Sequence, residues 1–338
     1  MDLNTLWFIL VSVLFAGFFF LEGFDYGAGA MLPLLGKSDK ERRLIINSFG
    51  PIWDGNEVWL LTAGGAIFAA FPHWYATLFS GFYLALFLIL LALILRIAAI
   101  EFRSKKEDPV WQKRWDIALT IGSAAPAFLF GVAVSNFVTG VPIAANMQYA
   151  GTLWNLLGPH DLLGGLVFLA LFCYHGCLFI NLKTDSPVLK ERVEKYAPRL
   201  FFAMLAMLVV WLVCMFILSD MFKSVPALIL TLLAAVALVF SILTFLKKRP
   251  GLAFIGTGAG IVLFTFAVFA GMFPNVMIST LDPAYSLTIY TASSSAYTLK
   301  LMSIVAACLV PIVLAYQAWT YWVFRKRITE KDLEQMHY

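Results

Sequence analysis

Residues Tyr83 to Lys106 read YLALFLILLALILRIAAIEFRSKK. The run is apolar as far as Ile100 except for Arg96, and it ends in the basic residues Arg103, Lys105 and Lys106. A helix needs about 20 apolar residues to cross about 30 Å of hydrocarbon. This stretch therefore predicts a transmembrane helix that ends at a positively charged face of the membrane.

The rest of the chain has the same character. Of its 338 residues, 61% are hydrophobic and only 13% are charged, against about 25% charged in an average soluble domain. The net charge is +4, without the basic patch beside aromatic residues that is typical of a nucleic-acid binder. Four cysteines make no disulfide framework. The composition excludes a soluble enzyme, a disordered chain and a nucleic-acid binder, and it predicts an all-α, polytopic integral membrane protein that forms one membrane domain over residues 1–338.

Nine apolar runs are long enough to span a bilayer. The predicted spans are 5–34, 50–71, 74–102, 116–139, 161–182, 199–220, 225–246, 251–273 and 297–324. The first apolar run follows MDLNT, which lacks the basic region of a secretory signal, so we expect no cleaved signal peptide. The first and third runs exceed a perpendicular span, so we expect tilt or an interfacial end there.

The basic residues indicate the orientation. All but three of the 24 Lys and Arg residues fall in alternate connections, around 37–43, 103–114, 183–199 and 247–249, and in the tail 325–338. The exceptions are Arg96, Lys223 and Lys300. Positively charged connections stay in the cytoplasm. We therefore predict nine transmembrane helices with the N-terminus outside and the C-terminal tail in the cytoplasm.

Six ionisable residues lie inside the first three predicted spans, all in the cytoplasmic half. They are Glu22 and Asp25 in the first span, Asp54 and Glu57 in the second, and Arg96 and Glu101 in the third. Members of each acidic pair are three residues apart and are predicted to share a helix face. Arg96 and Glu101 lie about 140° apart around their helix. Gly23 and Gly27 form a small-xxx-small pair that predicts close approach of another helix beside Asp25.

Charges inside a membrane cost about 2.5–3.5 kcal/mol each and are functional candidates by default. Arg96 can pair with only one or two of the five acids, so the others need protons or water. This surplus favours a partly hydrated proton inlet that opens to the cytoplasm. A buried ion-pair cluster that fixes the helix register is the alternative, and Glu101 is equally compatible with a place at the headgroups beside Arg103.

The histidines argue against a haem held by this chain. Of the four, only His175 lies well inside a predicted span, and haem iron in a helical bundle takes axial side chains from facing helices. We predict that His175 is a hydrogen-bonded packing residue. Cys173 and Cys177 share its helix and are predicted to be small apolar residues rather than metal ligands.

Three motifs make the sequence recognisable. They are EGFDYGAGAMLP (Glu22–Pro33), GPIWDGNEVWLLTAGGAIFAAFP (Gly50–Pro72) and LILRIAAIEFRSK (Leu93–Lys105). The chain closely resembles subunit II of the cytochrome bd-type quinol oxidases. The family often has proline after the intramembrane arginine, where this chain has Ile97.

The resemblance implies a haem-poor subunit in a bacterial cell membrane. It implies two four-helix bundles, 1–139 and 161–273, plus a ninth helix at 297–324. It also implies a partner, subunit I, that carries two b-type haems and haem d, while this chain ligates none. The complex would oxidise quinol and reduce O2 to water with protons from the cytoplasm. A small single-helix subunit and bound membrane lipid are further partners that the resemblance leaves open.

The resemblance also bears on single residues. Asp54 matches a family carboxylate on a proton route into subunit I, with Asp25, Glu57 and Arg96 as its neighbours. Trp53 matches a contact for a lipid or quinone tail. We therefore expect the chain to stabilise subunit I and to contribute a cytoplasmic proton inlet.

Two other functions remain. A proton-coupled secondary transporter places ionisable residues near the midplane, on broken helices and often within inverted repeats. Here the acids are displaced to one side and no inverted repeat is evident. A purely structural subunit without a proton role is the third possibility.

Overall fold

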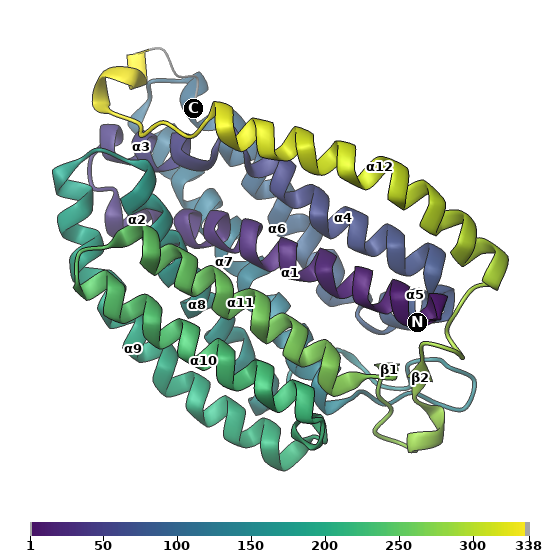
Figure 1. Ribbon diagram of the computed structural model, residues 1–338. Helices are drawn as coiled ribbons and strands as arrows, with labels where there is room; N and C mark the ends of the chain where they lie inside the picture. The colour runs from purple at the N-terminus through teal and green to yellow at the C-terminus, as the bar shows by residue number, and fades with distance from the viewer. Residues whose placement is uncertain (1, 335–338) are drawn as a thin grey trace.

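The computed structural model describes residues 2–334, and the regular secondary structure of the described chain is helical except for two short strands (Figure 1). The helices are α1 (Leu3–Ala30), α2 (Leu32–Leu35), α3 (Asp39–Phe49), α4 (Trp53–Ala70), α5 (Pro72–Gly81), α6 (Tyr83–Phe102), α7 (Pro109–Thr139), α8 (Pro159–Lys183), α9 (Pro187–Leu218), α10 (Val225–Leu246), α11 (Pro250–Met272) and α12 (Ala296–Val323). Strands β1 (Asn275–Met277) and β2 (Leu287–Thr288) pair antiparallel.

Among residues 2–334, eight helices are long and apolar enough to cross a membrane: α1, α6, α7, α8, α9, α10, α11 and α12. The all-α, polytopic membrane prediction is therefore confirmed. The predicted span 50–71 coincides with α4, a helix of 18 residues that carries two acids near its start and is outside this apolar set. The count of nine spans and their orientation stay predictions, as does the division into two bundles. His337 and the end of the predicted tail lie outside the described residues.

Several predicted boundaries differ from the observed ones. The surplus length of the runs 5–34 and 74–102 forms separate short helices, α2 and α5, each with a proline in its first turn. Helix α9 begins at Pro187 rather than at 199, because the Ser186 side chain accepts the Leu189 N–H and caps the helix. At about 48 Å, α9 is longer than the hydrocarbon is thick. The basic residues from position 187 onward, which the prediction assigned to the connection before 199, therefore lie on the first turns of α9.

Helix α1 lies at the centre, between α4, α7, α8 and α11. It meets α8 closely: Gly27 lies against the backbone of Phe172 and Gly176, and Gly23 lies against the Phe172 ring. A β-carbon at Gly27 would overlap the Phe172 carbonyl, so the close approach predicted from Gly23 and Gly27 is confirmed.

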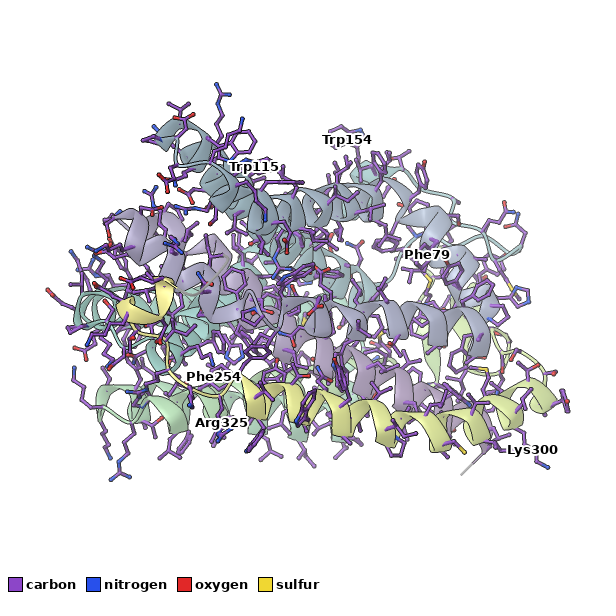
Figure 2. The ribbon with its side chains drawn as sticks, turned by 90° about the horizontal axis from the view of Figure 1, so that it is seen from above. Phe79, Trp115, Trp154, Phe254, Lys300 and Arg325 are labelled. Atoms are coloured by element: carbon purple, nitrogen blue, oxygen red, sulfur yellow. The ribbon has the colours of Figure 1, made fainter. Side chains whose placement is uncertain are left out.

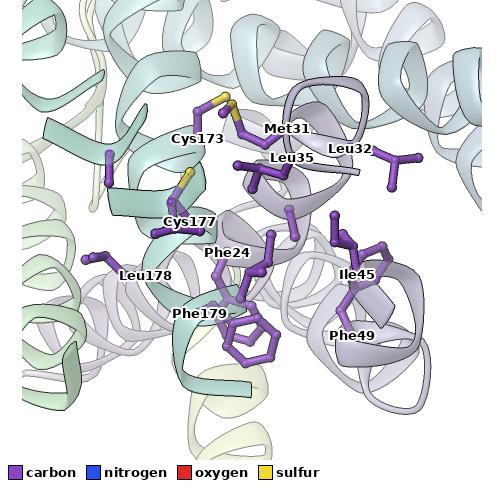
Figure 3. Packing of buried hydrophobic residues seen from close by; sticks show 14 of the residues in the cluster. Phe24, Met31, Leu32, Leu35, Ile45, Phe49, Cys173, Cys177, Leu178 and Phe179 are labelled. Atoms are coloured by element: carbon purple, nitrogen blue, oxygen red, sulfur yellow. The ribbon is translucent and has the colours of Figure 1, made fainter. Parts of the chain in front are cut away.

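A buried apolar cluster packs residues of α1, α2, α3 and α8 together (Figure 3). The rings of Phe24 and Phe179 stack with centroids 4.1 Å apart, and α3 packs Ile45 and Phe49 into the same cluster. Helix α3 begins with a capping box between Ser38 and Glu41. Cys173 and Cys177 are buried here among apolar side chains, as predicted.

Helix α12 runs beside α4 along one side of the bundle (Figure 1). Lys300 and Arg325 mark its opposite ends (Figure 2). Within α12 only Leu299 is fully buried. The position and rotation of α12 against the bundle therefore depend on its few polar contacts to the rest of the chain.

Candidate functional site

The structure brings four of the six predicted residues together, from three helices. Arg96 on α6 places Nη1 2.5 Å from Glu22 Oε1 on α1 and 2.8 Å from Glu57 Oε1 on α4. Asp25 lies one turn further along α1. Glu22, Asp25 and Arg96 are fully buried, whereas the Glu57 side chain is 15% exposed. We call these four residues the acidic cluster.

A hydrogen-bonded chain links Asp25 to α12. Asn56 Nδ2 donates to Asp25 Oδ2 at 2.6 Å, and the hydroxyl of Tyr321 donates to Asn56 Oδ1, also at 2.6 Å. Asn56 is fully buried. The sequence did not predict Asn56 or Tyr321 as members of the site, because the search inside the predicted spans was for ionisable residues and neither residue carries a charge. The position of Asn56 within the motif from Gly50 to Pro72, between two acids, is the signal that could have found it.

Aromatic rings complete the environment of Arg96. Its guanidinium carbon lies 4.9 Å from the centroid of the Tyr26 ring and 6.0 Å from that of Phe49. Rings that face a guanidinium attract it through their quadrupole. Arg96 is therefore held by both carboxylates and rings.

The acidic cluster and the adjoining Tyr26 are rich in buried polar atoms that have no hydrogen-bond partner among the described residues. They are Glu22 Oε2, Asp25 Oδ1, Tyr26 Oη, and Arg96 Nε and Nη2. Buried polar atoms are almost always satisfied by protein or by ordered water. A region with this many free donors and acceptors is suited to hold water and exchangeable protons.

Asp54 and Glu101 lie outside the cluster. Both are exposed, and within residues 2–334 Asp54 accepts a hydrogen bond from the adjacent Gly55 N–H. Asp54 and Glu57 are three residues apart in α4, about 60° around the helix, as their predicted shared face requires. Glu57 lies between Asp54 and the inward-facing Asn56 around the helix, and Asp54 therefore stays on the exposed side. Glu101 lies about 140° from Arg96, as its spacing implied. Trp53 is half-buried and packs against the apolar cluster of Figure 3.

His175 is buried and satisfied by protein groups. Its Nδ1 lies 2.8 Å from Thr257 Oγ1, and its Nε2 lies 3.2 Å from the Phe20 carbonyl. Its ring stacks on Phe254 with centroids 4.5 Å apart. These contacts fit the predicted packing role. Within residues 2–334 no group of three or more His, Cys, Asp or Glu side chains could hold a metal ion.

A large apolar cavity of about 950 Å³ lies beside the cluster's helices, lined by α1, α4, α5, α6, α7, α8 and α11. Leu61 and Phe68 of α4 and Phe87 of α6 are among its walls. Trp53 does not line it. The cavity suits an apolar chain and offers almost no polar group for chemistry.

Ion pairs tie the connections together at the end of the bundle where α3 lies. Buried Arg103 pairs with Asp116 at 2.6 Å and with Asp39 at 2.9 Å. Arg192 of α9 pairs with Glu41 of α3 at 2.6 Å. Burial raises the pKa of Glu41, but hydrogen bonds from Arg192 and from the backbone of Ser38 and Lys37 outweigh it and leave the pKa below its usual value. The contact therefore stabilises the fold at pH values above the usual carboxyl pKa. This stability is lost as the pH falls through the lowered pKa of Glu41.

Comparison with known proteins gives consistent matches along the whole chain. Residues 3–324 match the family described as cytochrome bd terminal oxidase subunit II. The chain is 42% identical over 333 residues to the cytochrome bd ubiquinol oxidase subunit 2 of Bacillus subtilis, and the match covers 98% of each chain. It is 35% identical over 369 residues to the cytochrome bd-I ubiquinol oxidase subunit 2 of Escherichia coli K12, covering 98% of this chain and 97% of that one. Among solved structures, the bd oxidase from Geobacillus thermodenitrificans matches with a TM-score of 0.69 at 16% identity, covering 96% of this chain and 100% of that chain.

Proposed function

The chain belongs to the cytochrome bd terminal oxidase subunit II family, and we propose that it supplies this quinol oxidase with a proton inlet from the cytoplasm. It is a multi-pass membrane protein and a subunit of a quinol:oxygen oxidoreductase. As a subunit II, it works in a complex with subunit I.

The observation that carries the proposal is the excess of buried acids. The acidic cluster sets three carboxylic acids against one guanidinium, and the ion pairs of Arg96 in the described part of the chain are with Glu22 and Glu57. Asp25 keeps one buried oxygen without a partner among the described residues. An uncompensated buried carboxylate is costly, so Asp25 needs a proton or water close by. A group with this requirement is suited to take up and release protons.

The proposed topology has nine spans, with α4 as the second. Helix α1 begins at the end of the bundle where β1 and β2 lie, and α12 ends at the opposite end, near α3 (Figure 1). Ion pairs join the basic connections at that end: Arg192 with Glu41, Arg103 with Asp39, and Lys248 with Glu194. The gathering of basic connections supports a cytoplasmic location for this end, in the inner membrane of a bacterium.

We assign the two b-type haems and haem d to subunit I. The described residues of this chain do not fit a haem, because protein groups occupy both nitrogens of His175 and a phenyl ring covers it. Quinol oxidation and O2 reduction would take place in subunit I. A third, single-helix subunit and a lipid or quinone tail at Trp53 stay predictions.

Asp54 is the group proposed to pass protons towards subunit I. A carboxylate at the start of an apolar helix is costly if it faces lipid, and Asp54 is exposed in this chain. Contact with subunit I would cover it. Around α4, Glu57 of the acidic cluster lies next to Asp54, about 60° away.

Replacing Asp54 by asparagine tests the inlet. We expect the complex to assemble with full haem content, because the hydrogen bond of Asp54 among the described residues is to the adjacent Gly55 N–H. We expect its O2 reduction to slow about tenfold or more, because the proton-carrying group is gone. Haem absorption and O2 consumption with a quinol measure the two effects. Asp282→Asn, which changes an exposed acid in the connection between β1 and β2, should change neither. Full O2 reduction by the Asp54 variant would remove this residue from the route.

A different measurement distinguishes a proton-coupled transporter from an oxidase subunit. Purified alone in vesicles, the chain should carry no solute against a proton gradient, whereas the chain purified with its partner should show haem absorption. Proton-driven transport by the lone chain would contradict the proposal.

Replacing His175 by alanine tests the haem assignment. We expect all haem bands of the complex to stay, while the folded state loses about 1–3 kcal/mol from its buried hydrogen bonds. Absorption spectra and the midpoint of thermal unfolding measure this. His73→Ala, at an exposed position, is the matched control. Loss of one haem band in an assembled His175 variant would show that this chain does ligate a haem.

A further inference from the structure

The side chains of Tyr321, Asn56 and Asp25 form a chain of hydrogen bonds from the outer helix α12 to the acidic cluster. We infer that Tyr321 is a positioning residue that fixes the orientation of the Asn56 amide and thereby controls whether Asp25 holds its proton. The inference rests on the proposed function for its role in turnover, but the control of Asp25 itself stands on the geometry alone.

The chemistry of the three groups allows two consistent arrangements. In the observed one, the tyrosine hydroxyl donates to the amide oxygen and the amide nitrogen donates to Asp25. A carboxylate only accepts hydrogen bonds, so this arrangement suits ionised Asp25. If Asp25 is protonated, its O–H can instead donate to the amide oxygen. The amide must then turn over, and its nitrogen must donate to the oxygen of Tyr321.

Protonation of Asp25, rotation of the Asn56 amide and rotation of the Tyr321 hydroxyl are therefore coupled. Asn56 is fully buried, so an amide turned without a new partner would leave a polar atom unsatisfied. Tyr321 supplies the partner in both arrangements. A phenylalanine at position 321 could neither donate a hydrogen bond to the Asn56 amide nor accept one from it. The Asn56 amide would then no longer be held in the orientation that points its nitrogen at Asp25.

Contacts at both ends of the cytoplasmic half of α12 hold Tyr321 in place. One turn before it, Gln317 accepts a hydrogen bond from Trp59 Nε1 at 2.9 Å and donates to the Gly55 carbonyl at 3.4 Å. After the helix, Ile328 N donates to the Lys183 carbonyl at 2.8 Å, and the ammonium of Lys183 donates to the carbonyls of Phe324 and Lys326. These contacts fix an otherwise exposed helix at the position where its tyrosine reaches Asn56.

The titratable and charged groups around Asp25 come from all four helices that meet there. They are Glu22 and Tyr26 of α1, Asp54 and Glu57 of α4, Arg96 of α6 and Tyr321 of α12. Tyr321 reaches Asp25 only through Asn56 in the described contacts. Its effect on Asp25 should therefore vanish when Asn56 is removed.

The test uses the assembled oxidase with Tyr321→Phe. The carboxylic C=O band of Asp25, identified by its loss in Asp25→Asn, is titrated by infrared difference spectroscopy. We expect its midpoint to move to higher pH by about half a unit to one unit, the value of one lost hydrogen bond. O2 reduction at neutral pH should fall several-fold with unchanged haem content. Tyr316→Phe makes the same chemical change on an exposed part of α12 and should alter neither.

A double-mutant cycle shows whether Asn56 is the intermediary. Asn56→Ala should displace the midpoint similarly, and adding Tyr321→Phe to it should produce no further displacement. An unchanged midpoint in Tyr321→Phe, or an equal displacement with and without Asn56, would overturn the inference. If Asp25→Asn keeps full turnover while Tyr321→Phe still moves the midpoint, the control of Asp25 stands and only the proton inlet fails.

Discussion

Replacing Arg96 by glutamine is expected to prevent accumulation of the assembled oxidase. Arg96 is fully buried and pairs with Glu22 and Glu57. Removing one partner of a buried ion pair costs about 3–5 kcal/mol, because it leaves a buried charge without compensation. That loss is a large share of the 5–15 kcal/mol by which native proteins are typically stable. The yield of haem-containing complex from membranes measures the effect.

Matched variants separate charge from packing. Arg325→Gln removes an exposed arginine at the end of α12 (Figure 2) and should leave the yield unchanged. Adding Glu22→Gln to Arg96→Gln removes the orphaned carboxylate and should restore part of the yield. Arg96→Lys should be intermediate, because an ammonium keeps the charge but lacks the planar fork. A normal yield from Arg96→Gln alone would mean that Glu22 and Glu57 are already neutral.

The sequence predicted the membrane class, the buried arginine and the close contact at Gly27, because each depends on local composition or spacing. It could not predict the rotational position of α4. The buried face of α4 consists of Asn56, Ala63, Ile67 and Ala70, yet its other faces are also apolar. Lipid is as apolar as a protein core, so hydropathy does not distinguish inward from outward positions in a membrane helix. For this reason the sequence could not show that Asn56 faces inward while Asp54 is exposed.

The contact of Tyr321 could not be predicted from the sequence, for a second reason. It joins a site whose other members lie more than two hundred residues earlier in the chain, and α12 is exposed along nearly its whole length. No periodic pattern on α12 points to one side. Its contact is fixed by Gln317 and by the segment after the helix, both of which depend on long-range packing. Such contacts appear only when the helices are assembled.

Replacing Asp25 by asparagine is expected to slow O2 reduction about a hundredfold, the typical contribution of a positioned proton-transfer group. The substitution keeps the size of the side chain, but the new amide cannot carry an exchangeable carboxyl proton. Haem content should stay normal, because Asp25 is not one of the two acids that pair with Arg96. O2 consumption with a quinol, normalised to haem, measures the loss.

The stability of the same variant distinguishes a proton relay from a structural ion-pair cluster. Asp25 is the buried acid in excess, so removing its charge should leave the thermal midpoint of the complex unchanged or raise it. Glu22→Gln, by contrast, removes a partner of Arg96 and should lower the midpoint. A relay thus predicts a variant that is slow and at least as stable, whereas a purely structural cluster predicts full turnover. Full turnover by Asp25→Asn would leave the acidic cluster with only the role of holding α1, α4 and α6 in register.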